Sequence, residues 1–137
     1  MYFFNLFLVL ILSFSFESQA VFSLNMDSNN TDLCVIEELR IQVPSDLKQT
    51  WLKAEREVWD PWLSMQDGFL GRQIFWNKDK EEALILVNWK NKKLWKSISI
   101  EEVNKIQEKF EDNVKTSLDV DVNPFKLVYE GDLDKQN

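Results

Sequence analysis

Histidine is absent from the 137 residues of the chain, and cysteine occurs once, as Cys34. Without an imidazole there is no His-based acid–base catalysis, no Ser–His or Cys–His nucleophile pair and no His-ligated haem, and most zinc sites are excluded. A single cysteine allows no disulfide within the chain. These absences remove the His-dependent enzyme classes from consideration.

Positive charge is also scarce. The chain has 16 Lys and Arg against 23 Asp and Glu, and its net charge is −7. Binding to nucleic acid needs a basic surface that replaces phosphate counterions, and docking on anionic lipid needs a polybasic patch. We therefore expect neither nucleic acid nor an anionic membrane surface as a partner.

Acidic residues near the C-terminus do not complete a metal motif. The segment Asp119-Val120-Asp121-Val122-Asn123 resembles the start of a calcium loop. The Gly and the distal Glu of an EF-hand are missing from it. We expect no metal ion and no cofactor.

The longest apolar run lies at the N-terminus. Residues 3–16 form a mostly apolar segment of about fourteen positions, shorter than the roughly 20 that cross a bilayer as a helix. Ser18-Gln19-Ala20 then places small residues where a signal peptidase cleaves. This pattern predicts a signal peptide over residues 1–20. Residues 21–33 are polar and aperiodic, which predicts a flexible lead-in.

Such a signal predicts export to the periplasm, the thylakoid lumen or the extracellular space, with no stable membrane association after cleavage before Val21. However, Met1 and Tyr2 lack the Lys or Arg that usually opens a signal peptide. Two alternatives therefore stay open. The segment is an uncleaved anchor, or Met26 is the true start and the protein is cytoplasmic.

Residues 34–130 predict one domain. Apolar side chains alternate with polar ones over residues 35–43, which indicates a strand that ends at Pro44. An apolar stripe at helical spacing then predicts an amphipathic helix, which Pro61 should stop or kink near Asp60. The residues of this stripe are Leu47, Trp51, Ala54, Val58 and Trp62.

The second half of the domain predicts a hairpin, a helix and a last strand. The predicted elements are strands over 69–76 and 83–89, a helix over 99–118 and a strand over 125–129. Ser99 and Glu102 form a capping box at the start of the helix. Residues 131–137 are polar and predict a loose tail.

The order of these elements is typical of an α+β, ferredoxin-like βαββαβ fold. Such a fold has a four-stranded antiparallel sheet with two helices on one face. The segment Leu84-Ile85-Leu86-Val87 is apolar on both faces of its strand. The face without helices would therefore expose an apolar patch, and a second copy of the sheet would cover it.

Several short motifs resemble those of a known protein family. They are Val35-Ile36-Glu37, Val58-Trp59-Asp60-Pro61, Gly68-Phe69-Leu70-Gly71, Val87-Asn88-Trp89 and Trp95. With them the chain resembles the dimeric α/β-barrel superfamily, in its antibiotic-biosynthesis-monooxygenase-like branch. Within that branch it looks like an uncharacterised, mainly cyanobacterial family. The resemblance covers residues 34–130.

This resemblance implies a homodimer in which two sheets pack face to face as a dimeric α/β barrel. Enzymes of the branch oxidise polycyclic phenols without a cofactor, or degrade haem. Haem degradation needs a His ligand, which the chain lacks. The oxygenases use a pocket with Asn, Trp and Tyr-type residues, and none of these matches position by position. The resemblance therefore implies the fold and the dimer but no catalytic residue.

Tryptophan is abundant, with six residues. Trp51 and Trp62 lie on the helical stripe, where filling the core is the usual role of Trp. Trp59 lies about 100° from Val58 around the helix and would face a partner or a pocket mouth. The alternative is that these residues and Trp89 line a cavity for a flat apolar ligand between the helices and the sheet.

Two polar residues of the strands have two interpretations each. Glu37 shares a strand face with apolar residues, where a carboxylate is costly unless it is paired or protonated. It is therefore exposed at the strand end, or it is a carboxyl of raised pKa that lines a pocket. Asn88 is a pocket group or lies at a solvent edge. Cys34 is a small buried residue or links two subunits.

These observations predict an exported homodimer that binds a small apolar or aromatic molecule in a Trp-rich cavity. One alternative is a cofactor-independent monooxygenase that acts on an aromatic substrate. Its acid–base group would be Glu37 or Tyr129, because no His is available. Another alternative is a structural dimer without a ligand. A cavity of a few hundred Å³ that holds Glu37 or Asn88 would favour a ligand or an enzyme.

Overall fold

The computed structural model describes residues 34–136. The signal peptide and the lead-in predicted for residues 1–33 lie outside the described residues. The strands are β1 (Val35–Gln42), β2 (Phe69–Asn77), β3 (Glu82–Trp89) and β4 (Lys126–Asp134). The helical segments are η1 (Ser45–Leu47), α1 (Lys48–Ala54), η2 (Glu55–Trp59), α2 (Asp60–Leu63), α3 (Lys92–Lys96) and α4 (Ile100–Leu118).

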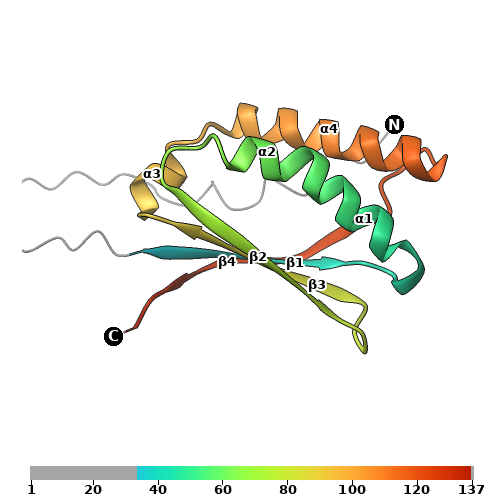
Figure 1. The fold of residues 1–137 in the computed structure, drawn as a ribbon, viewed down its shortest axis with the longest axis horizontal. Helices are drawn as coiled ribbons and strands as arrows, with labels where there is room; N and C mark the ends of the chain where they lie inside the picture. Colours follow the sequence, from blue (N-terminus) through green and yellow to red (C-terminus); the bar gives the residue numbers. More distant parts are fainter. Residues whose placement is uncertain (1–33, 137) are drawn as a thin grey trace, which may run out of the picture. The chain divides into compact units, whose positions relative to one another are not determined.

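The strands form one antiparallel sheet in the order β2-β3-β1-β4, and the helices lie over one of its faces (Figure 1). This confirms the predicted ferredoxin-like fold. The helix of the second half begins at the predicted capping box, in which the Ser99 hydroxyl accepts from the backbone N–H of Glu102. Within residues 34–136, no helix combines the length and the apolarity that crossing a membrane requires.

The register of the strands decides which side chains face the helices. Directly opposite residues of an antiparallel pair point to the same face. Four alternate residues of β3 are buried beneath the helices: Ala83, Ile85, Val87 and Trp89. Leu84 and Leu86 of the same strand therefore point to the other face, and the prediction of a strand apolar on both faces is confirmed.

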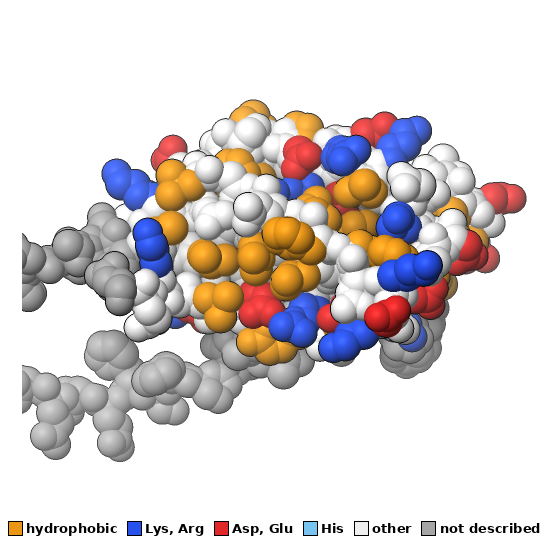
Figure 2. All heavy atoms as spheres, turned by 60° about the horizontal axis from the view of Figure 1, so that its bottom comes forward, with side chains coloured by type: hydrophobic (Ala, Val, Ile, Leu, Met, Phe, Trp, Pro, Cys, Tyr) orange, Lys and Arg blue, Asp and Glu red, His pale blue; other side chains and the backbone are white. Residues whose placement is uncertain are grey.

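The sheet face without helices, called the open face below, carries a group of apolar side chains. By register, its members are Ile36, Phe75, Leu84, Leu86, Tyr129 and Leu133. Figure 2 shows this side of the molecule, with apolar side chains gathered at its centre and charged ones around them. Within residues 34–136, no helix covers this group.

The first helical region does not stop at Asp60. Residues 45–63 stay helical through η2, a π-helical turn in which the backbone N–H of Asp60 donates to the carbonyl of Glu55. Pro61 then stands in the first turn of α2, directly after the wider turn. Of the predicted stop or kink near Asp60, the stop is wrong: the helical region continues past Pro61 through the wider turn of η2.

Two segments are more ordered than the sequence predicted. The connection after β3 contains α3, whose N-cap is Asn91: its side chain accepts from the backbone N–H of Leu94 at 2.8 Å. Residues 131–134, predicted as part of a loose tail, extend β4 to Asp134. The prediction of a loose tail is wrong for these residues, because the bonds that order them are long-range: Gly131 and Asp134 pair with β1.

Candidate functional site

Glu37 lies on the helix side of β1, opposite Val87 of β3. Its carboxylate oxygen Oε2 accepts a hydrogen bond of 3.0 Å from the indole Nε1–H of Trp89. The exposed strand end considered for Glu37 is therefore wrong. The carboxyl group is directed under the helices, because the first residues of β1 pair on both sides, with β3 and with β4.

Burial raises the pKa of Glu37 to about 7. Desolvation is the main cause, and the negative charge of Glu130 adds to it. The hydrogen bond from Trp89 and the positive charge of Lys96 act in the opposite direction. Glu37 is therefore a carboxyl group that exchanges its proton near neutral pH, as the sequence-based hypothesis of a raised pKa required.

Aromatic rings surround the Trp89 end of this pair. Trp95, from α3, stacks on Trp89 with 6.5 Å between ring centroids and 13° between ring planes. Phe69, from β2, packs edge to face against Trp89, with 5.8 Å between the ring centroids. On the outer side, the Nζ of Lys96 lies 3.6 Å from the ring centroid of Trp95. The site thus combines a titratable carboxyl, three aromatic rings and one ammonium group.

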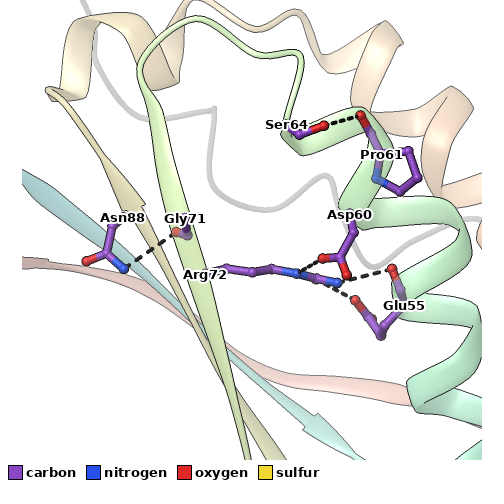
Figure 3. Close-up of polar contacts among 7 residues, drawn as sticks. All are labelled: Glu55, Asp60, Pro61, Ser64, Gly71, Arg72 and Asn88. Carbon is purple, nitrogen blue, oxygen red and sulfur yellow. Dashed lines mark hydrogen bonds and ion pairs between the residues drawn. The ribbon is translucent and has the colours of Figure 1, made fainter.

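A second polar group lies deeper between the sheet and the helices (Figure 3). Arg72 of β2 points at η2 and donates 2.6 Å bonds to the carboxylates of Glu55 and Asp60. It also donates to the backbone carbonyl of Glu55 at 3.1 Å. The side chains of Arg72 and Glu55 are only 6% and 3% exposed. Burial raises the pKa of Glu55, although Arg72 opposes this effect.

This ion cluster accounts for the π-helical turn. The carbonyl of Glu55 accepts from both Asp60 N–H and Arg72, so the wider turn places it within reach of the guanidinium group. A π-helical turn is energetically unfavourable by itself and is found mostly where side chains require it. Arg72 therefore stabilises the π-helical turn, and the carboxylates of Glu55 and Asp60 neutralise its charge.

Two of the four tryptophans predicted to line a cavity lie in the core. Trp51 and Trp89 are each 1% exposed and are part of the packed core. Trp59 and Trp62 are partly exposed and contact each other edge to face at 5.7 Å. The Nε1–H of Trp51 is buried without a partner among the described residues. The usual role of Trp, filling the core, therefore holds for Trp51 and Trp89.

Two surface hollows lie elsewhere. One of about 460 Å³ is at the end of α4, beside Asp112 and Asp119, and one of about 300 Å³ is on the open face, between Arg40 and Phe75. Neither is lined by Glu37, by Asn88 or by the predicted tryptophans.

Asn88 lies on the open face, since it pairs with Ile36 of β1. Its Nδ2 is 3.5 Å from the carbonyl oxygen of Gly71, the residue opposite it on β2. Asn88 is thus separated from Glu37 by the thickness of the sheet. Cys34 is a partly exposed free thiol. Among residues 34–136, no group of His, Cys, Asp and Glu side chains could hold a metal ion.

The sequence reasoning missed the Arg72 cluster and α3. Arg72 shares a face of its strand with the apolar Ile74 and Trp76, which indicates that it points toward the core. Glu55 lies one helical turn after Trp51, which indicates that it lies on the buried side of its helix. Both signals were present, but they did not show that the two charges meet. On the open face, Arg40 pairs with Glu38, with 2.8 Å between Nε and Oε1.

No family model and no curated protein sequence matches the chain. Solved structures do match its fold. The ActVA-Orf6 monooxygenase of Streptomyces coelicolor, solved in complex with nanaomycin D, is 13% identical. The alignment covers 82% of this chain and 96% of that protein, with a TM-score of 0.53. The two chains share one fold.

Two further solved structures match with lower TM-scores. A dimeric ferredoxin-like protein from an uncultured marine organism is 18% identical over 76% of this chain and 95% of its own, with a TM-score of 0.46. SnoaB, a cofactor-independent oxygenase from Streptomyces nogalater, is 12% identical over 76% and 94%, with a TM-score of 0.42. The predicted resemblance to monooxygenase-like ferredoxin-fold proteins is confirmed as a likeness of fold. The narrower cyanobacterial family stays a prediction.

Proposed function

We propose that the protein is an exported homodimer that binds a small aromatic molecule at Glu37, beside the stacked rings of Trp89 and Trp95. The observation that carries this proposal is the Glu37 carboxyl itself, which is held by an indole N–H at 3.0 Å among aromatic rings. Aromatic rings bind flat apolar groups, and one convergent polar group orients them. A packing role alone would be served better by an apolar residue, because burial of a carboxyl is costly.

The tryptophan indole N–H resonances of isotope-labelled protein test this proposal. During titration with 2-naphthol, a flat and neutral aromatic molecule, the resonances of Trp89 and Trp95 should shift and then saturate. Trp95→Leu should abolish the shift at Trp89, whereas Trp59→Leu, a matched change away from Glu37, should leave it intact. Unchanged resonances of all six tryptophans up to the solubility limit would contradict ligand binding and favour a structural dimer.

The homodimer follows from the open face. Phe75 and Tyr129 on this face are 51% and 47% exposed, and large exposed apolar patches mark interaction sites. A flat face four strands wide fits another sheet better than a single peptide segment. The same face carries both charge signs, in Arg40, Glu38 and Glu82. Two-fold symmetry would bring this patch onto itself, so we assign a second copy as its partner.

A second candidate activity is a cofactor-independent monooxygenase, and the pKa of Glu37 near 7 favours it. A carboxylate with this pKa can remove a phenolic proton at neutral pH. The balanced reaction would convert a phenol and O2 into a quinone and water. The test is O2 consumption with a phenolic substrate. One O2 consumed for each quinone formed, and loss of this activity in Glu37→Gln, would support the activity, and an equal rate without protein would contradict it.

Export is proposed from the N-terminal apolar segment and its small-residue cleavage site. N-terminal sequencing of the protein from its host should begin at Val21. An intact Met1 would mean an anchor instead. A first residue of Met26 would mean a cytoplasmic protein.

A further inference from the structure

Carboxyl groups accumulate at the corner of the sheet beneath α3. Glu130, Asp132 and Asp134 alternate along β4, and their register with β1 places them on the same face as Glu37. Glu130 is near enough to raise the pKa of Glu37 through its charge. Four carboxyl groups therefore share this corner on the helix side of the sheet.

The short helix α3 places ammonium groups over this corner. Lys92 pairs with Asp132 at 2.6 Å. Lys96 lies on the ring of Trp95, and its charge acts on Glu37. An ammonium group thus already rests on an aromatic ring beside a buried carboxyl, and the chain itself supplies it.

We propose that this corner binds an organic cation, a flat apolar group that carries a protonated amine. Glu37 would be its counter-ion, Trp89 and Trp95 its aromatic walls, and Lys96 the internal ammonium that the ligand replaces. The inference rests on the ligand binding proposed above and adds the class of ligand. A cation over a Trp face is attracted by the ring quadrupole, and a carboxylate forms its strongest hydrogen bonds with charged donors. An anion would be repelled by Glu37 and Glu130.

The internal ammonium can be displaced at low cost. α3 has five residues, too few to be a stable helix by itself. Its ion pair to the sheet is exposed, with 60% of the Lys92 side chain accessible, and exposed ion pairs contribute little. The Lys96 side chain is also exposed, so it can return to water when a ligand takes its place.

Three probes of nearly equal shape test the proposed class: 2-phenylethylamine, 2-phenylethanol and 3-phenylpropionate. The titrations use the full chain at about pH 8, where Glu37 is ionised and the amine is protonated. The indole resonances of Trp89 and Trp95 report binding. The amine should bind about tenfold more tightly than the alcohol, and the propionate should bind most weakly.

The outcomes separate this inference from the proposed function. Equal affinities of the three probes would overturn the cation class and leave aromatic binding standing. Tighter binding of the propionate would overturn the cation class as well. No binding of any probe would overturn both proposals.

Variants locate the charge recognition. Lys96→Met should tighten amine binding about threefold and leave the alcohol unchanged, because it removes the competing ammonium. Lys93→Met makes the same charge change at an exposed position of α3 and should alter amine binding less. Glu37→Gln should lower the affinity for the amine to the level of the affinity for the alcohol. Loss of the dispersed indole resonances would mean that Glu37→Gln does not fold. In that case Glu130→Gln takes its place, and it should lower the affinity for the amine but not for the alcohol. Weaker amine binding in Lys96→Met, or an amine preference that survives both Glu variants, would overturn the proposal.

Discussion

On the helix side of the sheet, Ile85 and Val87 of β3 are each 2% exposed, whereas Phe75 and Tyr129 on the open face are 51% and 47% exposed. Both faces are apolar, but the helices of the chain cover only one. Burial of apolar surface is the main stabilising term in folding, so the covered face explains how one chain folds. The open face leaves apolar side chains such as Phe75 and Tyr129 exposed to solvent when the described domain is alone.

Charged groups differ between the faces in the same way. Arg72 on the helix side is 6% exposed and pairs with the buried Glu55. Arg40 on the open face is 43% exposed and pairs with Glu38, whose side chain is only 9% exposed. Removal of one partner of a buried ion pair is strongly destabilising, whereas an exposed arginine contributes little. The same residue type therefore has two different energetic roles in one sheet.

The largest effect is expected in the covered core. Trp51→Ala removes a side chain that is 1% exposed and should lower the free energy of unfolding by about 3–5 kcal/mol. Trp59→Ala, a matched change at a partly exposed position of the same helical region, should cost less than half as much. Thermal and denaturant unfolding measure both. Equal, small losses in the two variants would contradict the assignment of Trp51 to the core.

The next effect compares the two arginines. Arg72→Met leaves the carboxylate of Glu55 buried without its guanidinium partner and should cost roughly 3 kcal/mol. Arg40→Met, the comparison change on the open face, should cost less within one chain, because Arg40 itself is 43% exposed, although it also leaves the 9% exposed Glu38 carboxylate without its partner. Denaturant titrations of both variants give this difference.

A double variant tests the cause of the Arg72 effect. Glu55→Gln in the Arg72→Met background removes the unpaired charge and should restore part of the lost stability. If the double variant is as unstable as the sum of the two single variants, the charge of Glu55 is not the source of the loss.

A smaller, pH-dependent effect is expected at Glu37. Its pKa is about 7 in the folded protein and 4.5 as its ordinary value, so the folded state binds the proton more strongly. The stabilisation linked to this proton is complete below about pH 4.5 and is lost as the pH rises to about 7, by at most about 3 kcal/mol. Glu37→Gln should therefore be more stable than the unchanged protein at about pH 8 and similar at about pH 4.

The Trp89 indole N–H resonance gives a direct measurement of the same group. It should shift with a midpoint near pH 7, since the indole donates to Glu37. In Glu37→Gln this shift should disappear. A midpoint near the ordinary 4.5 would mean that the carboxyl is hydrated in solution.

The fold could be predicted because its determinants are local. Alternation in β1, the helical stripe through Trp51 and the capping box of Ser99 each specify an element within a few residues. The tail was mispredicted because β4 beyond residue 130 has a polar sequence, and its hydrogen bonds come from β1, about a hundred residues away along the chain. The continuation of the helix past Pro61 was not predicted, because the carbonyl of Glu55 in the π-helical turn is bound by Arg72, from a distant strand.

The site could be predicted only in part. The inward side chain of Glu37 follows from the period of its strand, so its raised pKa was a testable hypothesis from sequence. Its partners Trp89 and Trp95 come from segments more than 50 residues later, and only the register and α3 bring them together. Whether each tryptophan fills the core or lines a cavity could not be predicted from sequence, because it depends on packing in three dimensions.

The mass of the protein in solution tests the central claim that a second copy covers the open face. Sedimentation at micromolar concentration should give twice the chain mass for the unchanged protein. Phe75→Glu, which places a charge in the patch, should give the mass of one chain with an unchanged helix and strand content. A single-chain mass for the unchanged protein, or a dimer that survives Phe75→Glu, would contradict the claim.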